Sequence, residues 1–280
     1  MASVLILNQS NVTQQNNVFQ YNFPSGSVNF KDKQIAVQSI IIPYSWYNIT
    51  STYNNQSFNI TIPRTDGVAT TTLNITVPAG FYTVQQLNSY IQSQLIANNI
   101  GYLVNASGAN VYYIEIVSNL NLNSAQLNCY VCPNSLPLGW ANPASWALPS
   151  TGTRVPQLTT LANNFGLLIG FASSTTFPAS STQASTYSIT SKFTPTISPV
   201  ESVLVNCNLV NNILSVPSNI ITAIPITSSF ATQIIYNPNE LIWLPILDGS
   251  YPYFRISFLD QNSNQLGMND TNIVMSLLIK

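Results

Sequence analysis

Short stretches in which apolar and polar residues alternate run through most of this chain. In residues 18–23, VFQYNF, the aromatic side chains fall on one face of an extended strand and the amides on the other. Further strand-like stretches occur at residues 35–42, 58–62, 73–77, 111–117, 201–205, 251–259 and 271–279. Because many short strands accompany few helical patterns, the sequence predicts an all-β fold, either a sandwich or a jelly roll.

One segment has the pattern of a helix. Thr83 and Gln86 stand at the spacing of a capping box, and apolar residues follow at helical intervals. These apolar residues are Val84, Leu87, Ile91 and Leu95. The sequence therefore predicts one short helix here, and residues 159–168 are a second helical candidate.

The middle of the chain has no regular period. Pro, Trp and Gly interrupt residues 119–154, and residues 173–191 are almost entirely Ser, Thr and Ala, a composition typical of a solvated loop. We therefore expect a single domain over residues 1–280, with an insertion or elaborated loop region at about 119–200. The pair Asp66-Gly67 suits a tight hairpin turn and is expected to join the strands at 58–62 and 73–77.

Charge is scarce in this chain. Charged residues make up 5% of it, against about 25% in an ordinary soluble domain, and the net charge is −1. A surface of neutral amides and hydroxyls carries little long-range field, so close approach of copies meets little repulsion and self-association is favoured. An Asn-rich coding bias in an AT-rich genome is an alternative source of the same composition. The basic residues are scattered, which argues against nucleic-acid binding.

The usual catalytic and cofactor-binding residues are missing. The chain has no histidine, and neither glycine-rich nucleotide-binding motif occurs. Five acids fall in turn-like contexts, where Asp commonly bonds to its own backbone: Asp32, Asp66, Asp248, Asp260 and Asp270. We therefore expect no enzyme activity, no cofactor and no metal, and a glycosidase assembled from distant loops is left open.

The chain has three cysteines, Cys129, Cys132 and Cys207. An odd number at low density argues against a disulfide scaffold. The C-x-x-C pair lacks the two further ligands that a structural zinc site needs. We expect buried, reduced thiols at all three positions.

Three aromatic residues next to prolines are structural candidates. Tyr44 and Trp46 follow Pro43 at the end of a predicted strand, and Trp243 precedes Pro245. A large aromatic side chain at such a corner fixes the path of the chain by packing. We expect Tyr44, Trp46 and Trp243 to have this role or to lie in an interface.

Two charged residues, Glu115 and Arg255, are interface candidates. Each lies on a predicted strand face that otherwise carries apolar or tyrosine side chains, where a charge needs a partner. Either these faces point outward, with the tyrosines extending toward solvent, or one or both charges form ion pairs in a contact between subunits.

Several stretches, taken in order, resemble one protein family. They are IAVQSIIIPYSWYNI at 35–49, PAGFYTVQQLN at 78–88 and the tail at 254–279, with GLLIGF at 166–171 as a partial match. This combination is similar to the penton, or minor capsid, proteins of virophages and of polinton-like (Maverick) viruses. The resemblance covers about residues 18–279 and is weakest across 119–160 and 173–195.

The resemblance implies a single jelly roll of two antiparallel four-stranded sheets. Homopentamers of such a protein close the fivefold vertices of an icosahedral double-stranded DNA virus capsid, beside trimers of a major capsid protein. The implied partners are thus further copies and those trimers, without direct nucleic-acid contact, and the insertion would face outward. The expected location is the virion, after synthesis in the host cell interior, since the first residues lack a signal-peptide pattern and no segment suits a membrane span.

A carbohydrate- or receptor-binding β-sandwich, such as a lectin-like adhesin, is the alternative function. Trp140 and Trp146 lie in the irregular middle, and aromatic residues among amides suit sugar binding. A secreted adhesin would, however, usually carry an export signal. A double-jelly-roll major capsid protein needs more chain than 280 residues.

Overall fold

The computed structural model describes residues 2–15, 17–65 and 69–280. These residues divide into two compact units. The terminal unit combines the chain up to Trp46 with Val200–Lys280, and the inserted unit is Tyr47–Pro199. Every strand pairing among the described residues lies within one of the two units.

Two antiparallel sheets form the terminal unit. The first has the order β1-β21-β5-β17, with β18 paired to β5, and the second has the order β16-β15-β20-β3-β2. The strands of the first sheet are β1 (Ser3–Asn8), β5 (Gln34–Pro43), β17 (Gln233–Tyr236), β18 (Leu244–Pro245) and β21 (Val274–Ile279). The strands of the second are β2 (Thr13–Gln15), β3 (Val18–Asn22), β15 (Ser202–Cys207), β16 (Ile220–Pro225) and β20 (Tyr253–Leu259). Two short strands, β4 (Val28–Phe30) and β19 (Gly249–Tyr251), pair with each other.

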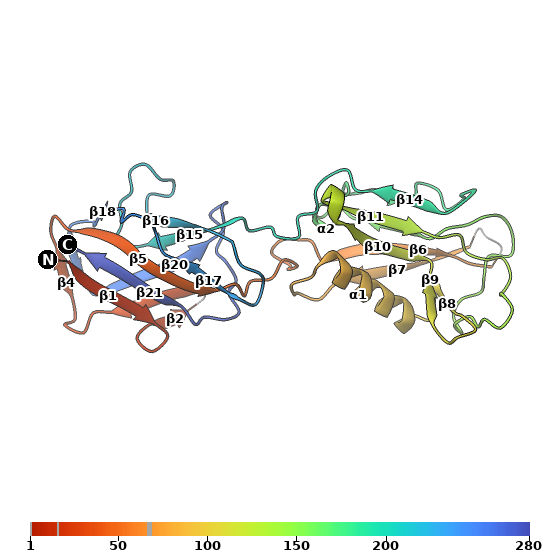
Figure 1. Cartoon of the computed structure of the whole chain (residues 1–280), viewed down its shortest axis with the longest axis horizontal. Coiled ribbons are helices and arrows are strands. Elements are labelled where there is room, and N and C mark those ends of the chain that lie inside the picture. The colour runs from red at the N-terminus through yellow and green to blue at the C-terminus, as the bar shows by residue number, and fades with distance from the viewer. Residues whose placement is uncertain (1, 16, 66–68) are drawn as a thin grey trace. The chain divides into compact units, whose positions relative to one another are not determined.

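The strand order of the terminal unit is that of a jelly roll. Without the short strands β2, β4, β18 and β19, the first sheet contains the first, eighth, third and sixth strands along the chain, and the second sheet contains the fifth, fourth, seventh and second. Because β1 pairs antiparallel with β21, the two ends of the chain lie side by side (Figure 1). The expected all-β jelly roll with two antiparallel sheets is confirmed, and β18 and β2 each add a short strand to a sheet.

Alternating side chains of the jelly-roll strands form the core of the terminal unit. Phe254, Ile256 and Phe258 of β20 share the inward face and are buried, as the period-two pattern predicted. Phe258 meets Phe19 of β3 edge to face, with ring centroids 5.7 Å apart. Each such side chain contributes about 1.5–3 kcal/mol when fully buried, so these alternating residues hold the second sheet to the core.

The inserted unit leaves the jelly roll between β5 and β15, its third and fourth strands. It has a sheet of order β13-β12-β6-β7, a sheet of order β10-β11-β14 and the hairpin β8-β9. Its strands are β6 (Ser57–Pro63), β7 (Thr70–Thr76), β8 (Tyr102–Val104), β9 (Asn110–Tyr112), β10 (Ile114–Asn119), β11 (Ser124–Cys129), β12 (Gln157–Thr160), β13 (Thr176–Phe177) and β14 (Tyr187–Thr190). Its helices are α1 (Val84–Ala97), the short α2 (Phe165–Leu168) and the 3₁₀ turn η1 (Leu120–Leu122).

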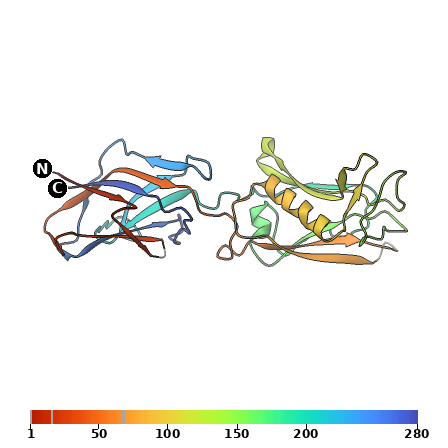
Figure 2. The same cartoon turned by 90° about the horizontal axis from the view of Figure 1, so that it is seen from below.

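Helix α1 begins at the predicted capping box. The backbone N–H of Gln86 donates to the Thr83 hydroxyl at 3.2 Å, and the backbone N–H of Thr83 donates to the side-chain oxygen of Gln86 at 2.8 Å. The four predicted apolar positions of the helix are all buried. Helix α1 lies beside β10 (Figure 2), and its four buried residues belong to the core of the inserted unit.

A buried asparagine joins the two ends of the inserted unit. The Asn48 carboxamide donates to the carbonyls of Tyr82 and Ile197, each at 2.8 Å, and accepts from the Tyr82 amide at 2.8 Å. Asn55 donates to the Asn48 carbonyl at 2.8 Å. Asn48 and Tyr82 belong to the first two stretches that carry the family resemblance, so the fold brings those stretches into contact.

The boundary of the inserted unit differs from the insertion predicted at about 119–200. The unit begins at Tyr47, so it also contains β6, β7 and α1. Residues 47–118 have clear strand and helix patterns of their own. A local pattern does not show which other segments a strand packs against. The prediction therefore counted residues 47–118 among the strands of the main domain.

Three local predictions within the inserted unit were wrong. Residues 111–117 belong to two strands and not one. The extended conformation is interrupted at Tyr113, and β9 and β10 join different sheets. Residues 157–160 form a strand, and only 165–168 of the second helical candidate are helical. The Ser- and Thr-rich stretch 173–191 contains β13 and β14, which are edge strands whose partners supply their hydrogen bonds. The predicted Asp66-Gly67 turn lies outside the described residues.

Candidate assembly surfaces

Tyr44 and Trp46 lie at the end of β5 and are both buried. Their rings are 4.5 Å apart between centroids and are tilted by 31°. The edge of Phe230 meets the Tyr44 ring at 5.7 Å, and Ser45 bonds to the backbone of Asp270 at 2.9 Å and 3.2 Å. This corner thus ties the end of β5 to two other segments of the terminal unit.

Trp243 is half-buried and directly precedes the short strand β18. The ammonium group of Lys280 lies 4.0 Å from the centroid of its ring, a cation–π contact between the last residue and the β17–β18 connection. The pairing of β18 with β5 places Leu244 opposite Ile35. Trp243 therefore contacts the C-terminal residue beside the first sheet.

Glu115 projects from the half-exposed face of β10 and has neutral partners. It accepts a short hydrogen bond from the Tyr130 hydroxyl and a second from the Asn128 carboxamide at 3.0 Å. The hydrogen bond to Glu115, followed by burial, raises the pKa of Tyr130 to about 12, so the hydroxyl remains a donor near neutral pH. Glu115 thus has one hydrogen-bond partner on the neighbouring strand β11 and one just after that strand, and its place in a subunit contact stays a prediction.

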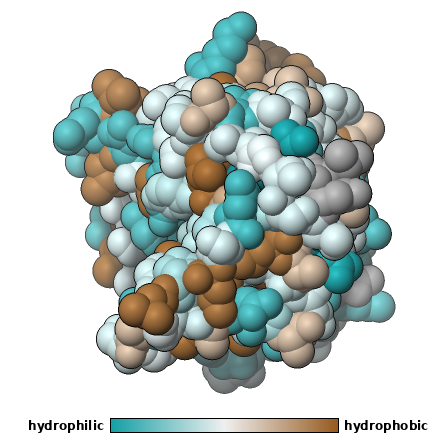
Figure 3. Space-filling view, turned by 90° about the vertical axis from the view of Figure 1, so that its right-hand side faces the viewer, coloured by the Kyte–Doolittle hydropathy of each residue, from teal (hydrophilic) through white to brown (hydrophobic). Residues whose placement is uncertain are grey.

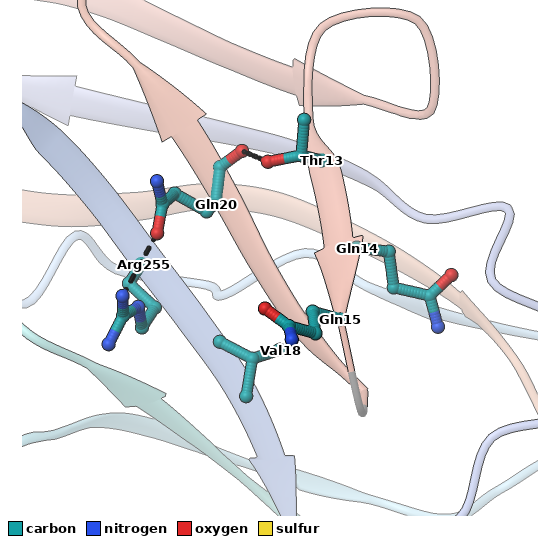
Figure 4. Close-up of a pocket in the computed structure, with 6 residues that line it drawn as sticks. All are labelled: Thr13, Gln14, Gln15, Val18, Gln20 and Arg255. Carbon is teal, nitrogen blue, oxygen red and sulfur yellow. Dashed lines mark hydrogen bonds between the residues drawn. The ribbon is translucent and has the colours of Figure 1, made fainter.

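Arg255 lies exposed on the outer face of the second jelly-roll sheet. Its guanidinium donates to the Gln20 carboxamide at 2.9 Å and lies 4.8 Å from the centroid of the Tyr253 ring. It borders a shallow hollow of about 490 Å³ (Figure 4). The hollow is lined by Thr13, Gln14, Gln15, Val18, Gln20 and Arg255. Arg255 is the sole charged residue in this lining, so the hollow presents one positive charge among neutral amides.

The outer face of the first jelly-roll sheet is uncharged and carries exposed aliphatic side chains beside the polar Ser39, Ser276 and Gln38. Cross-strand pairs align Ile235, Ile41 and Val274 in one row over β17, β5 and β21. Val4 and Ile6 of the edge strand β1 share this face because their register places them beside β21. Val4, Ile6, Ile235 and Val274 are 42% to 59% exposed. The strands β1, β5, β17 and β21 contain no charged residue. The solvent-facing side of an antiparallel sheet is usually polar, so this composition is unusual.

A loop of the terminal unit exposes three more aliphatic side chains. It joins β15 to β16 and is closed by a hydrogen bond from the Asn212 amide to the Ser218 carbonyl at 2.6 Å. Within it, Ile213, Leu214 and Val216 are 82% to 97% exposed. We call residues 212–218 the aliphatic loop, which projects from the body of the unit (Figure 1).

The inserted unit also has exposed apolar residues. Figure 3 looks onto the end of this unit at which β8 and β9 lie, where hydrophobic residues form a band among more hydrophilic ones. Leu138 of this unit is fully exposed, and its segment pairs with β8 through Ala141 and Val104. Trp146 is buried and donates to the Pro63 carbonyl at 2.9 Å, so it is not a platform for a sugar. Trp140 is half-buried.

The described acids and cysteines are dispersed. Asp260 and Asp270 accept hydrogen bonds from amides of their own turns, as predicted. Among the described residues, no group of three or more Cys, Asp or Glu lies close enough to hold a metal ion. No helix in the described parts of the chain has the length and apolar character to cross a membrane.

The three cysteines are free and buried, as predicted. Burial raises the pKa of Cys129 and Cys207 to about 12, and burial together with the nearby Cys129 raises the pKa of Cys132. The thiolate is the reactive form of cysteine. All three thiols are therefore protonated and shielded at neutral pH.

Sequence reasoning missed the aliphatic loop and the outer face of the first sheet. The signal for the loop was present, since Ile213, Leu214 and Val216 follow two asparagines without a strand or helix period. The signal for the sheet was ambiguous. In residues 3–8, SVLILN, both faces of the strand carry aliphatic side chains, and the sequence does not say which face is covered.

The chain is similar to solved structures of virophage proteins. It is similar to the crystal structure of the mavirus penton protein, with 9% sequence identity, a TM-score of 0.45 and 99% of each chain covered. It is also similar to a chain in the cryo-electron microscopy structure of the Sputnik virophage, with 12% identity, a TM-score of 0.41, and 99% of this chain and 97% of that chain covered. No family model matches the sequence, and no curated protein matches it.

Proposed function

We propose that this protein is a non-enzymatic structural component of a virion, a penton whose homopentamers close the fivefold vertices of an icosahedral double-stranded DNA virus capsid. The observation that carries the proposal is the uncharged outer face of the first jelly-roll sheet, with its exposed aliphatic side chains. The aliphatic loop and the sequence resemblance to virophage and polinton-like penton proteins support it. The mechanism is mechanical: surfaces of one copy bury surfaces of the next.

Exposed aliphatic side chains on a sheet favour association. Val4, Ile6, Ile235 and Val274 remain in contact with water in the single chain. Each Å² of apolar surface removed from water contributes about 25 cal/mol, and no charge on these strands has to be desolvated. Association through this face therefore gains hydrophobic free energy without the main electrostatic cost.

A ring of five copies needs a contact between two different patches. In a heterologous interface, one patch of each copy meets another patch of the next, and the ring closes when the rotation is a fifth of a turn. The aliphatic sheet face and the aliphatic loop are two such patches on different strands of the terminal unit. Major capsid protein trimers are the proposed neighbours of the ring, and the inserted unit is proposed to face outward from the shell.

The experiment that tests the proposal is the native mass of the purified full chain by light scattering, over a wide range of protein concentration. The expected result is a species near five times 30.6 kDa. The matched variant Val4→Thr/Ile6→Thr keeps β-branched side chains on the strand and should shift the mass toward the monomer while leaving the fold intact.

Two outcomes would contradict the proposal. A discrete trimer would favour a receptor-binding fibre or lectin head instead of a fivefold ring. A chain that stays monomeric up to its solubility limit would contradict a ring that closes through its own surfaces.

A further inference from the structure

Arg255 has no acidic partner among the described residues of its own chain. Its guanidinium contacts the neutral carboxamide of Gln20 and the ring of Tyr253, both on the outer face of the second jelly-roll sheet. A guanidinium has five N–H donors, and the contact to Gln20 uses one of them. Figure 4 shows it at the rim of a hollow whose other lining residues are neutral. Its remaining donors are suited to a carboxylate from another molecule.

Glu240 is the matching acid. It is exposed in the segment after β17 and makes no hydrogen bond or ion pair with any other described residue. It borders a hollow of about 500 Å³ and is the sole charged residue in its lining. That lining consists of Tyr236, Asn237, Pro238, Asn239, Glu240 and Ile242. Each hollow therefore holds one charge, and the two charges are opposite.

Other described acids of the terminal unit are less suited to Arg255. Asp260 and Asp270 accept backbone amides of their own turns, and Asp248 accepts the Asp32 amide at 2.9 Å. Asp32 stands between two lysines in the sequence. Glu201 is exposed, but it directly precedes β15, which pairs with the Arg255 strand β20.

The two hollows belong to different sheets of the jelly roll. Glu240 follows β17, an edge strand of the first sheet, and Arg255 lies on β20 in the second. A heterologous contact joins different patches of successive copies, so a residue of one sheet can meet a residue of the other sheet on the next copy. The same arrangement brings the aliphatic face of the first sheet, which includes Ile235 of β17, toward the second sheet of the neighbour, to which the aliphatic loop belongs.

We propose that Arg255 of one copy pairs with Glu240 of the next copy across the subunit contact, an inference that rests on the proposed ring. The ligand of the Arg255 hollow is then the carboxylate of a second copy of this chain. The pair fixes the register of the contact, because complementary charges select one alignment while aliphatic surfaces tolerate several.

Charge reversal tests this pairing in the full chain. Arg255→Glu and Glu240→Arg each place like charges together, so each is expected to raise the dissociation constant of the assembly about tenfold or more, since about 1.4 kcal/mol corresponds to a factor of ten. The double variant restores opposite charges and is expected to return within about threefold of wild type. Glu201→Arg is the matched control, with the same change of charge at an exposed acid outside the hollow, and should leave the dissociation constant unchanged. Circular dichroism confirms that each variant is folded.

Cross-linking gives a second readout that does not need a stable assembly. Arg255→Cys and Glu240→Cys proteins are mixed and treated with a short bis-maleimide, and the three native thiols are buried. A covalent dimer that forms in the mixture, and not with either protein alone, is the expected result. A Glu201→Cys protein in place of the Glu240→Cys protein should give no such product.

The outcomes separate this inference from the proposed function. A pentamer without rescue in the double variant and without the specific cross-link would overturn the pairing and leave the penton proposal standing. The specific cross-link in an assembly of another number of copies would support the pairing and overturn the fivefold ring. Absence of both assembly and cross-link would overturn both.

Discussion

Trp46 shows how much a single side chain contributes to the terminal unit. Its ring packs against the tilted ring of Tyr44 just after β5, and it is almost fully buried. The indole N–H makes no hydrogen bond with the described residues. The ring therefore stabilises the corner by packing, whereas the buried N–H opposes folding because it loses its bond to water.

Substitution of Trp46 separates these two effects. Trp46→Ala leaves a large cavity and is expected to lower the free energy of unfolding by about 3–5 kcal/mol. Trp46→Phe keeps an aromatic ring and removes the unpaired N–H. It is expected to lower the free energy of unfolding by less than about 1.5 kcal/mol. Urea denaturation followed by circular dichroism measures both. Equal stability of Trp46→Ala and wild type would mean that the indole does not fix the corner.

At the scale of an element, the aliphatic loop combines internal order with an exposed apolar surface. Its backbone is closed by the bond between Asn212 and Ser218, and the Leu214 amide donates to the Asn212 carboxamide at 3.2 Å. These bonds hold Ile213, Leu214 and Val216 outward, where they add nothing to the core. An ordered loop with this surface is suited to contact with another protein chain.

The triple variant Ile213→Ser/Leu214→Ser/Val216→Ser tests the role of this loop. The side chains are already exposed, so the free energy of unfolding of the single chain should change little, while self-association weakens because apolar area is lost from the contact. Light scattering measures the association, and thermal unfolding measures the stability. Leu138→Ser, at a fully exposed leucine of the inserted unit, is the control and should not affect the ring. An unchanged native mass of the triple variant would exclude the loop from the interface.

At the scale of the whole molecule, the chain forms two units with separate cores. The described strand pairings of residues 47–199 all lie among those residues. Phe58 stacks on Phe165 at 4.1 Å within a core that also includes the buried face of α1. Asn48 bonds to Tyr82 and Ile197, and so joins the first and last segments of the unit.

We expect residues 47–199 to fold when they are expressed alone. A unit with its own core and closed hydrogen bonding should retain far-ultraviolet circular dichroism and a cooperative thermal transition. Phe58→Ala in the same fragment is the matched control, and the loss of about 3–5 kcal/mol should reduce or abolish the transition. A fragment that lacks a cooperative transition without any substitution would show that the inserted unit depends on the terminal unit.

The sequence predicted the elements of this protein better than their partners. The strands at 18–22, 35–42 and 58–62, the strand at 253–259 within the predicted 251–259, and the capping box at Thr83 were predicted, because side-chain direction and cap spacing depend on neighbours in the chain. The sequence pattern did not predict the interruption between β9 and β10 at Tyr113, or the strands β13 and β14. Those features depend on hydrogen bonds from distant strands, and local pattern does not contain that information.

By itself, the sequence pattern determined that this protein is an all-β sandwich or jelly roll with one capped helix and a low-charge, amide-rich composition, and the family resemblance favoured the jelly roll. Only the tertiary structure decided where the inserted unit begins, and which aliphatic face of β1 remains outside. It also decided that Arg255 lies on β20 of the second sheet and Glu240 in the segment that follows β17 of the first sheet, each without an oppositely charged partner among the described residues. The physical reason is that alternation fixes the two faces of a strand locally, whereas the choice of the covered face is made by contacts between residues far apart in the chain.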